Sequence, residues 1–302
     1  MTFLGVRLLL LAAAVAVAPS RPVFRSEIGL VVLQATVKNA RGEVVKDLDR
    51  GAFTVYENGK RQTLSVFHRD DVPVSLGILI DNSGSMKNKR AQVEAAALAL
   101  VRASNPEDEV FVLNFGDKPR LDVPFTRDRA VLEAGIRRVD SVGGTAMRDA
   151  IEAGESYLSS HAVHDRRVLL VVTDGNDNAS MAPMGRICQV AERSGTVIDA
   201  IGLLAEEDPP KARRAREDLD KLTEATGGVA YYPHGVEEVG AIALELAAQI
   251  RSQYTLGYSP VNQALDGSYR KLRVVAKGPE RLVVRTRAGY RAVAAPEGGQ
   301  KR

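Results

Sequence analysis

Five oxygen-bearing side chains, spread over three segments, have types and spacing that suit one metal ion. A carboxylate and two hydroxyls alternate in the first segment, a hydroxyl follows two glycines in the second, and a carboxylate precedes a glycine in the third. These residues are Asp81, Ser83, Ser85, Thr145 and Asp174. Oxygen ligands suit a hard cation, Mg²⁺ first, with Ca²⁺ and Mn²⁺ as alternatives. The set contains no His or Cys, which disfavours zinc.

Each of these segments alone also has a purely structural interpretation. In this interpretation, the turn at residues 81–85 does no more than cap a helix, and Thr145 is simply the N-cap of another helix. Asp174 is then simply the residue at which a strand ends in an Asp-Gly turn. We predict a metal site because the three segments occur in this order, each in a matching context of strand and helix.

The elements that must position these residues follow from the hydropathy pattern of residues 71–253. Apolar β runs such as 74–80 and 168–172 alternate there with helical patterns. This alternation predicts an α/β fold with a doubly wound, mainly parallel sheet that helices cover on both faces. Ligands bind at the carboxyl ends of strands in such sheets. Asp81 and Asp174 both follow predicted strands, so we expect them at one edge of the sheet.

The segments 27–70 and 254–293 read as β structure on either side of this unit. An Asn58-Gly59 pair between alternating runs is typical of a hairpin. A lone hairpin is only marginally stable in water. We therefore predict that the two flanks join into one small β domain with the α/β domain inserted between them; two separate β appendages are the alternative. Residues 294–302 are predicted to be a disordered tail.

The first residues have the pattern of an export signal. Arg7 precedes the apolar run 8–18, which ends in small residues. We predict a signal peptide over 1–26; an uncleaved membrane anchor is the alternative, but the run is shorter than the roughly 20 residues that span a bilayer. The mature chain is then exported, periplasmic or extracellular, with no stable membrane insertion after cleavage.

Composition excludes several other classes of protein. The 41 basic and 38 acidic residues leave a net charge of +3, which gives no electrostatic reason to expect nucleic acid as a partner. Cys188 is the single cysteine, so the chain has no intramolecular disulfide and no CxxC redox pair. Cys188 stands between apolar residues of a predicted helix, where we expect a small buried side chain.

The motif residues carry a resemblance to a known family. The pattern Asp81-x-Ser83-x-Ser85, followed by Thr145 and Asp174, resembles the metal-ion-dependent adhesion site of von Willebrand factor A domains, and the resemblance covers residues 71–253. The flanking segments 53–59 and 254–258 resemble a bacterial secreted family related to these domains.

This resemblance implies a VWFA, Rossmann-like fold, in which the serines and the threonine tend to bind the metal directly and the aspartates often act through water. It also implies that an Asp or Glu carboxylate of a partner protein completes the coordination. We therefore predict a protein-binding module of the adhesion type.

A metal-dependent hydrolase is the main alternative, and a structural envelope protein is another. Hydrolysis needs a base beside the metal. His161 and His164 precede the strand that begins near Val168, at the edge of the sheet opposite Asp174. The sequence also has no GxSxG elbow, phosphate-binding loop or GxGxxG fingerprint. We predict that the protein is not an enzyme.

Overall fold

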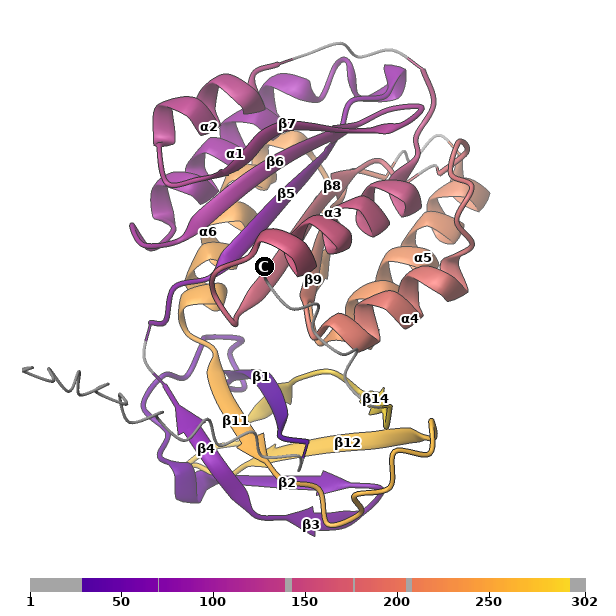
Figure 1. Cartoon of the computed structure of the whole chain (residues 1–302). Coiled ribbons are helices and arrows are strands. Elements are labelled where there is room, and N and C mark those ends of the chain that lie inside the picture. The colour runs from indigo at the N-terminus through magenta and orange to yellow at the C-terminus, as the bar shows by residue number, and fades with distance from the viewer. Residues whose placement is uncertain (1–28, 70, 139–142, 176, 205–207, 294–302) are drawn as a thin grey trace, which may run out of the picture.

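The computed structural model describes residues 29–69, 71–138, 143–175, 177–204 and 208–293. The predicted signal peptide at 1–26 and the predicted tail at 294–302 lie outside these ranges. Within the ranges, no helix is both long and apolar enough to cross a membrane. Two units stand out, an α/β unit and a β unit (Figure 1).

The α/β unit is built on a six-stranded sheet with the strand order β10-β9-β8-β5-β6-β7. Every neighbouring pair is parallel except β6 and β7. Ile80 pairs with Val172, so β5 and β8 end at the same edge of the sheet. The strands are β5 (Ser75–Asp81), β6 (Glu109–Phe115), β7 (Pro119–Thr126), β8 (Arg167–Thr173), β9 (Val197–Gly202) and β10 (Ala230–Tyr231).

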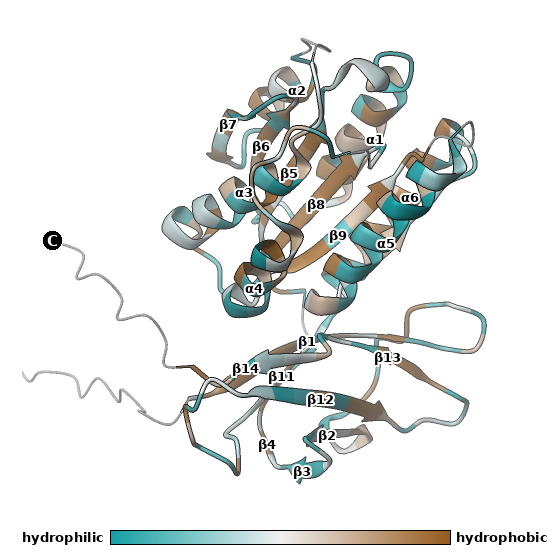
Figure 2. Cartoon of the chain, turned by 90° about the vertical axis from the view of Figure 1, so that its right-hand side faces the viewer, coloured by the Kyte–Doolittle hydropathy of each residue, from teal (hydrophilic) through white to brown (hydrophobic). Residues whose placement is uncertain are grey.

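Helices cover both faces of this sheet, and each face has its own apolar core. Ile78 packs with α1, α2 and α6 on one face, while Leu79 packs with α3, α4 and α5 on the other. The strands are correspondingly the most apolar part of the unit (Figure 2). The helices are α1 (Arg90–Ala103), α2 (Arg129–Ile136), α3 (Met147–His161), α4 (Met184–Ser194), α5 (Pro209–Thr226) and α6 (Val239–Arg251), with 3₁₀ turns at Gly84–Met86 and Val236–Glu238; a further 3₁₀ turn, Arg50–Ala52, precedes β2 (Phe53–Glu57) outside this unit. The predicted doubly wound α/β fold is confirmed.

The β unit combines strands from both flanks of the chain. Its two sheets have the orders β13-β1-β11-β4 and β14-β12-β2-β3, so each sheet contains strands from before and after the α/β unit. The predicted joining of the flanks into a β domain is therefore confirmed. The strands are β1 (Val31–Lys38), β2 (Phe53–Glu57), β3 (Lys60–Gln62), β4 (Leu64–His68), β11 (Tyr254–Tyr258), β12 (Tyr269–Ala276), β13 (Val283–Arg285) and β14 (Gly289–Arg291).

The predicted hairpin joins β2 to β3. Asn58 and Gly59 both have positive φ, 48° and 80°. Two central residues in the left-handed region match the twist of paired strands. Asn58 also holds a third strand, because its side-chain oxygen accepts from the N–H of Lys271 on β12 at 2.8 Å.

Arg166 holds together the two segments by which the chain passes between the β unit and the α/β unit. Its buried guanidinium donates to the carbonyl oxygen of Val72 at 3.1 Å, to the side chain of Gln253 at 3.0 Å and to the carbonyl oxygen of Ile250. Arg251 pairs with Asp71 at 2.6 Å beside it. The two ends of the α/β unit thus lie together, as insertion of one domain into another requires.

Glu155 on α3 is a buried carboxylate with incomplete hydrogen bonding. The hydroxyl of Thr196 donates to its Oε2 at 3.0 Å, but its Oε1 has no partner among the described residues. Burial raises the pKa of Glu155 to about 7. The folded protein therefore holds the proton of Glu155 at pH values where the unfolded chain has released it.

We expect Glu155→Gln to flatten the pH dependence of stability. The pKa of Glu155 is higher in the folded protein than in the unfolded chain. The wild type therefore loses stability as the pH rises from about 4.5 to 7, by about 1.4 kcal/mol per pH unit, and its stability no longer changes with this group above pH 7. Since the amide does not ionise, the free energy of unfolding of the variant minus that of the wild type should rise by about 2–3 kcal/mol between pH 5 and pH 8. Urea unfolding at several pH values measures this difference. Glu152→Gln, on the same helix, is the control, and an equal rise there would contradict the assignment.

Candidate metal centre

The carboxylate of Asp81 closes strand β5 and is held from two sides. The backbone N–H of Ser83 donates to its Oδ1 at 2.9 Å, and the hydroxyl of Thr173, at the end of β8, donates to its Oδ2 at 2.6 Å. Asp81 is fully buried. The end of β8 therefore fixes the orientation of the carboxylate that ends β5.

The hydroxyls of Ser83 and Ser85 lie next to each other in the turn that follows. Their Oγ atoms are 3.1 Å apart, Ser83 is buried, and Ser85 is exposed. Met86, with no exposed surface, anchors the end of the turn in the core. The pair therefore forms an oxygen-lined spot that is open to solvent on one side.

Asp174 follows β8 and lacks a partner for one of its oxygens. Its Oδ1 is buried without any hydrogen bond to the described residues. The pKa of Asp81 is raised to about 6, chiefly by burial and also by the negative charge of Asp174, against the hydrogen bonds from Thr173 and Ser83. The two carboxylates are thus close enough for the charge of Asp174 to act on Asp81.

Thr145 reaches this region through backbone contacts. The N–H of Gly84 donates to the carbonyl oxygen of Gly143 at 3.3 Å, which joins the loop before Thr145 to the Asp81–Ser85 turn. Thr145 is buried, and its N–H donates to the side chain of Asn178 at 2.9 Å. Helix α3 begins at Met147 with Ala146 as its N-cap, so Thr145 is not the cap.

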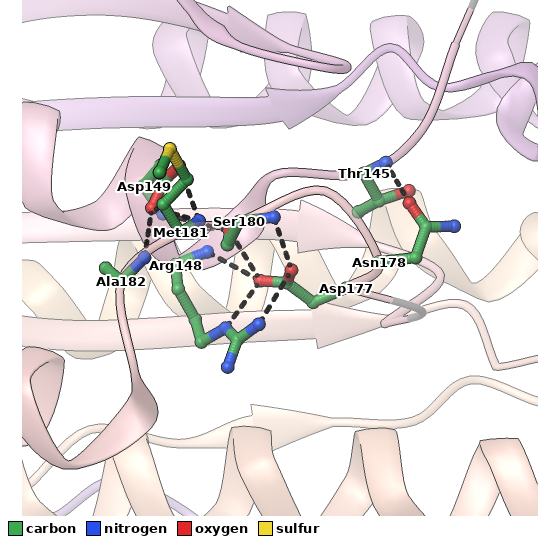
Figure 3. Close-up of polar contacts among 8 residues, drawn as sticks. All are labelled: Thr145, Arg148, Asp149, Asp177, Asn178, Ser180, Met181 and Ala182. Carbon is green, nitrogen blue, oxygen red and sulfur yellow. Dashed lines mark hydrogen bonds and ion pairs between the residues drawn. The ribbon is translucent and has the colours of Figure 1, made fainter.

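A network of hydrogen bonds holds the loop after Asp174 against the start of α3 (Figure 3). We call residues 177–182 the clamp loop. Asp177 accepts from the backbone N–H and the guanidinium of Arg148 at 2.8–3.2 Å and from Ser180. Asp149 accepts from the N–H groups of Met181 and Ala182. The clamp loop therefore couples the segment of Asp174 to that of Thr145.

Several of these supporting residues are not recognisable from the sequence as part of the site. Paired carboxylates in a loop are usually solvated, yet the side chain of Asp177 is 4% exposed and pairs with Arg148. Thr173 and Asn178 also have no motif of their own. The one signal in the sequence is position, because all of them stand within four residues of Asp174 or Thr145.

The residues present fit a hard cation. Two carboxylates and three hydroxyls supply oxygen only, and the orphaned Oδ1 of Asp174 has the charge that a cation would compensate. Over the part of the chain that the structure describes, no three His, Cys, Asp or Glu side chains converge as a metal cluster. A site with two carboxylates and neutral hydroxyls is consistent with that finding.

The histidines considered for catalysis lie away from these residues. His161 ends α3 and stacks on Tyr157 with the ring centroids 4.3 Å apart. His164 precedes β8, and its ring contacts the carbonyl oxygen of Glu107 at 3.1 Å. Both stand at the amino-terminal edge of the sheet, as predicted. Cys188 is buried on α4, and burial raises the pKa of its thiol, so it is the small core residue that was expected.

Comparison with known proteins identifies the α/β unit. The family model described as the von Willebrand factor type A domain matches residues 76–176. None of the curated proteins compared with the chain matches it. Residues 76–176 thus match the von Willebrand factor type A domain.

Solved structures share this fold at low sequence identity. A von Willebrand factor type A protein from Catenulispora acidiphila is 15% identical with a TM-score of 0.52, over 91% of this chain and 76% of that one. Proximal thread matrix protein 1 of the mussel byssus, with a zinc-occupied MIDAS motif, is 16% identical with a TM-score of 0.51, over 64% of this chain and 49% of that one. A mutant of the PilB minor pilin from Streptococcus sanguinis is 10% identical with a TM-score of 0.50, over 61% and 63%.

We expect Asp177→Ala to loosen the clamp loop and the start of α3 together. The change leaves the half-buried guanidinium of Arg148 without its partner, which costs about 1–3 kcal/mol. Amide hydrogen exchange should become faster at Thr145 and Met181, and urea unfolding gives the loss of stability.

The matched control is Asp122→Ala. The side chain of Asp122 is 1% exposed and pairs with Arg120 at 2.8 Å, on β7. Asp122→Ala should lower the free energy of unfolding by a similar amount, but amide exchange at Thr145 should stay as slow as in the wild type. Unchanged exchange there in Asp177→Ala would contradict the coupling.

Proposed function

We propose that the chain is an exported, metal-ion-dependent protein-binding module. The cation is held at the carboxyl ends of β5 and β8, where both strands end at the same edge of the sheet. Mg²⁺ is the first choice, with Ca²⁺ or Mn²⁺ as alternatives, because the ligands are hard oxygens. The proposed ligands, directly or through water, are Asp81, Ser83, Ser85, Thr145 and Asp174.

The observation that carries this proposal is the orphaned carboxylate oxygen of Asp174. A buried charged oxygen without a partner is costly unless something compensates it. The carboxylate of Asp81 is close enough to interact with Asp174, and this increases the cost of burying the two negative charges. A divalent cation would compensate both charges. The mussel protein, which has zinc in its MIDAS motif, is a precedent for a cation in this fold.

The hydroxyl ligands favour binding of a partner over a closed structural site. Ser83, Ser85 and Thr145 supply neutral oxygens, so a bound cation keeps part of its charge. Ser85 is exposed, which leaves an approach from solvent. A carboxylate from an Asp or Glu of another protein fits such a position in charge and in hardness.

We favour binding over hydrolysis because, among the described residues, no histidine or lysine forms a hydrogen bond with the proposed ligands. Their hydrogen-bond partners in the described ranges are hydroxyls, backbone groups and an amide. A general base has to lie within hydrogen-bond reach of the group it deprotonates, directly or through one water. The two histidines at the opposite sheet edge do not meet this requirement.

The proposed location is the periplasm or the exterior of the cell. It rests on the apolar run 8–18 and its small flanking residues. A single cysteine is compatible with an oxidising compartment because it has no intramolecular partner. We also propose that the mature chain does not bind nucleic acid and does not insert stably into a membrane.

Calorimetric titration with Mg²⁺ should give one site in the wild type and at least about tenfold weaker binding in Asp81→Asn, because one of the two charges that face the cation is gone. Asp199→Asn is the matched control. Asp199 lies on β9, is 4% exposed, and burial raises its pKa to about 6, as for Asp81. This variant should bind like the wild type. Equal binding by Asp81→Asn and Asp199→Asn would reject the ligand assignment.

Immobilised wild-type protein should retain a partner from envelope extract of the native host in Mg²⁺ and release it in EDTA. Asp81→Asn should retain little in either buffer, and Asp199→Asn should behave like the wild type. The cation would then act by completing a contact with the partner's carboxylate. Retention that is equal with and without EDTA would rule out the metal-dependent mode.

A further inference from the structure

A cleft of about 390 Å³ opens beside the proposed metal centre, between the ends of β9 and β10 and the first turns of α5. Its walls are mostly apolar, from Gly202, Leu204, Pro209, Ala212, Tyr232 and Pro233. Its polar groups are those of Arg213, Arg216 and His234, and none of the described residues that line it is acidic. The cleft therefore combines an apolar floor with a basic rim.

The cleft and the proposed metal centre share a wall. Gly175, which follows Asp174, packs so closely that an added Cβ would lie 2.5 Å from the Cβ of Ala215 and 3.0 Å from Leu204. Leu204 lines the cleft on the other side. The neighbouring N–H of Leu203 donates to the carbonyl oxygen of Thr173 at 2.8 Å. The cleft and the proposed metal centre are therefore neighbours across this wall.

Arg216 is held in place by a stacking contact. Its guanidinium lies over the ring of Tyr232, 3.8 Å from the centroid. The hydroxyl of Tyr232 donates to Asp220 at 2.7 Å, which fixes the ring. In the part of the chain that the structure describes, no carboxylate pairs with Arg216, whereas Arg213 lies 3.8 Å from Glu217. A stacked guanidinium keeps its N–H edge free for a carboxylate.

We propose that this cleft binds a second acidic side chain of the same partner segment whose first carboxylate completes the metal site. This inference rests on the proposed function. Arg216 takes the carboxylate through two parallel N–H···O bonds, and the apolar floor takes the methylene stem. Two linked contacts raise the affinity through effective concentration, and they select partners with two acidic residues over those with one.

The probe is fluorescein-labelled hexaglutamate, and its binding to the full chain is followed by fluorescence anisotropy in Mg²⁺ and in EDTA. Arg216→Gln should weaken binding about tenfold, because a charge-assisted bidentate contact is lost. Arg214→Gln is the matched control: it makes the same change of charge two residues away on α5, outside the cleft. It should weaken binding by less than about twofold, and Arg216→Lys should restore only part of the loss.

The outcomes separate this cleft from the metal function. Weaker binding by Arg216→Gln than by Arg214→Gln supports the cleft, in Mg²⁺ or in EDTA, provided that urea unfolding gives both variants the same stability. Binding that depends on Mg²⁺ but is equal in the two variants overturns the cleft and leaves the metal function standing. No binding of hexaglutamate to the wild type also overturns the cleft. Absence of Mg²⁺ binding in calorimetry overturns the metal function instead.

Discussion

The candidate site depends on two carboxylates that come together at one buried edge of the sheet. Asp81 and Asp174 end neighbouring parallel strands, so the same register that builds the sheet also brings the like charges together. Burial raises the pKa of Asp81, and Asp174 adds to this rise. Hydrogen bonds from Ser83 and Thr173 offset part of the cost for Asp81, but the buried oxygen of Asp174 receives none. An arrangement with this electrostatic cost is expected where function requires it.

Close packing of the sheet keeps the ends of β5 and β8 next to each other. An added Cβ at Gly77, in the middle of β5, would come within 3 Å of Phe111 on β6 and Leu169 on β8, so the three central strands cannot move apart or slide without opening the core. Buried interiors tolerate little change of volume. The clamp loop acts in the same way at the surface, because Asp177 and Asp149 fix it to α3. The core and the loop thus restrict the same few side chains.

The sequence allows the fold and the central motif to be predicted because both depend on local patterns. Alternating apolar strands and helices predict a parallel sheet, and a parallel sheet places Asp81 and Asp174 at one edge. The burial of Asp177 is different, since it depends on how the loop folds against Arg148, 29 positions away. The cleft at Arg216 depends on stacking between a helix and Tyr232, and no local pattern encodes it. The joining of the flanks was predictable from the weakness of lone hairpins, but the strand order was not.

The insertion also determines which edge of the α/β unit is free. Both crossings to the β unit lie beside Arg166, where β5 begins at Ser75. The candidate site lies where β5 ends, at Asp81, six residues after Ser75, or about 20 Å along the strand. The β unit therefore packs at the amino-terminal edge of the sheet, on the far side from the candidate site (Figure 1). A contact between Arg291 and Glu192 at 3.9 Å supports this arrangement. The β unit can thus serve as a base that leaves the carboxyl-terminal edge open to a partner.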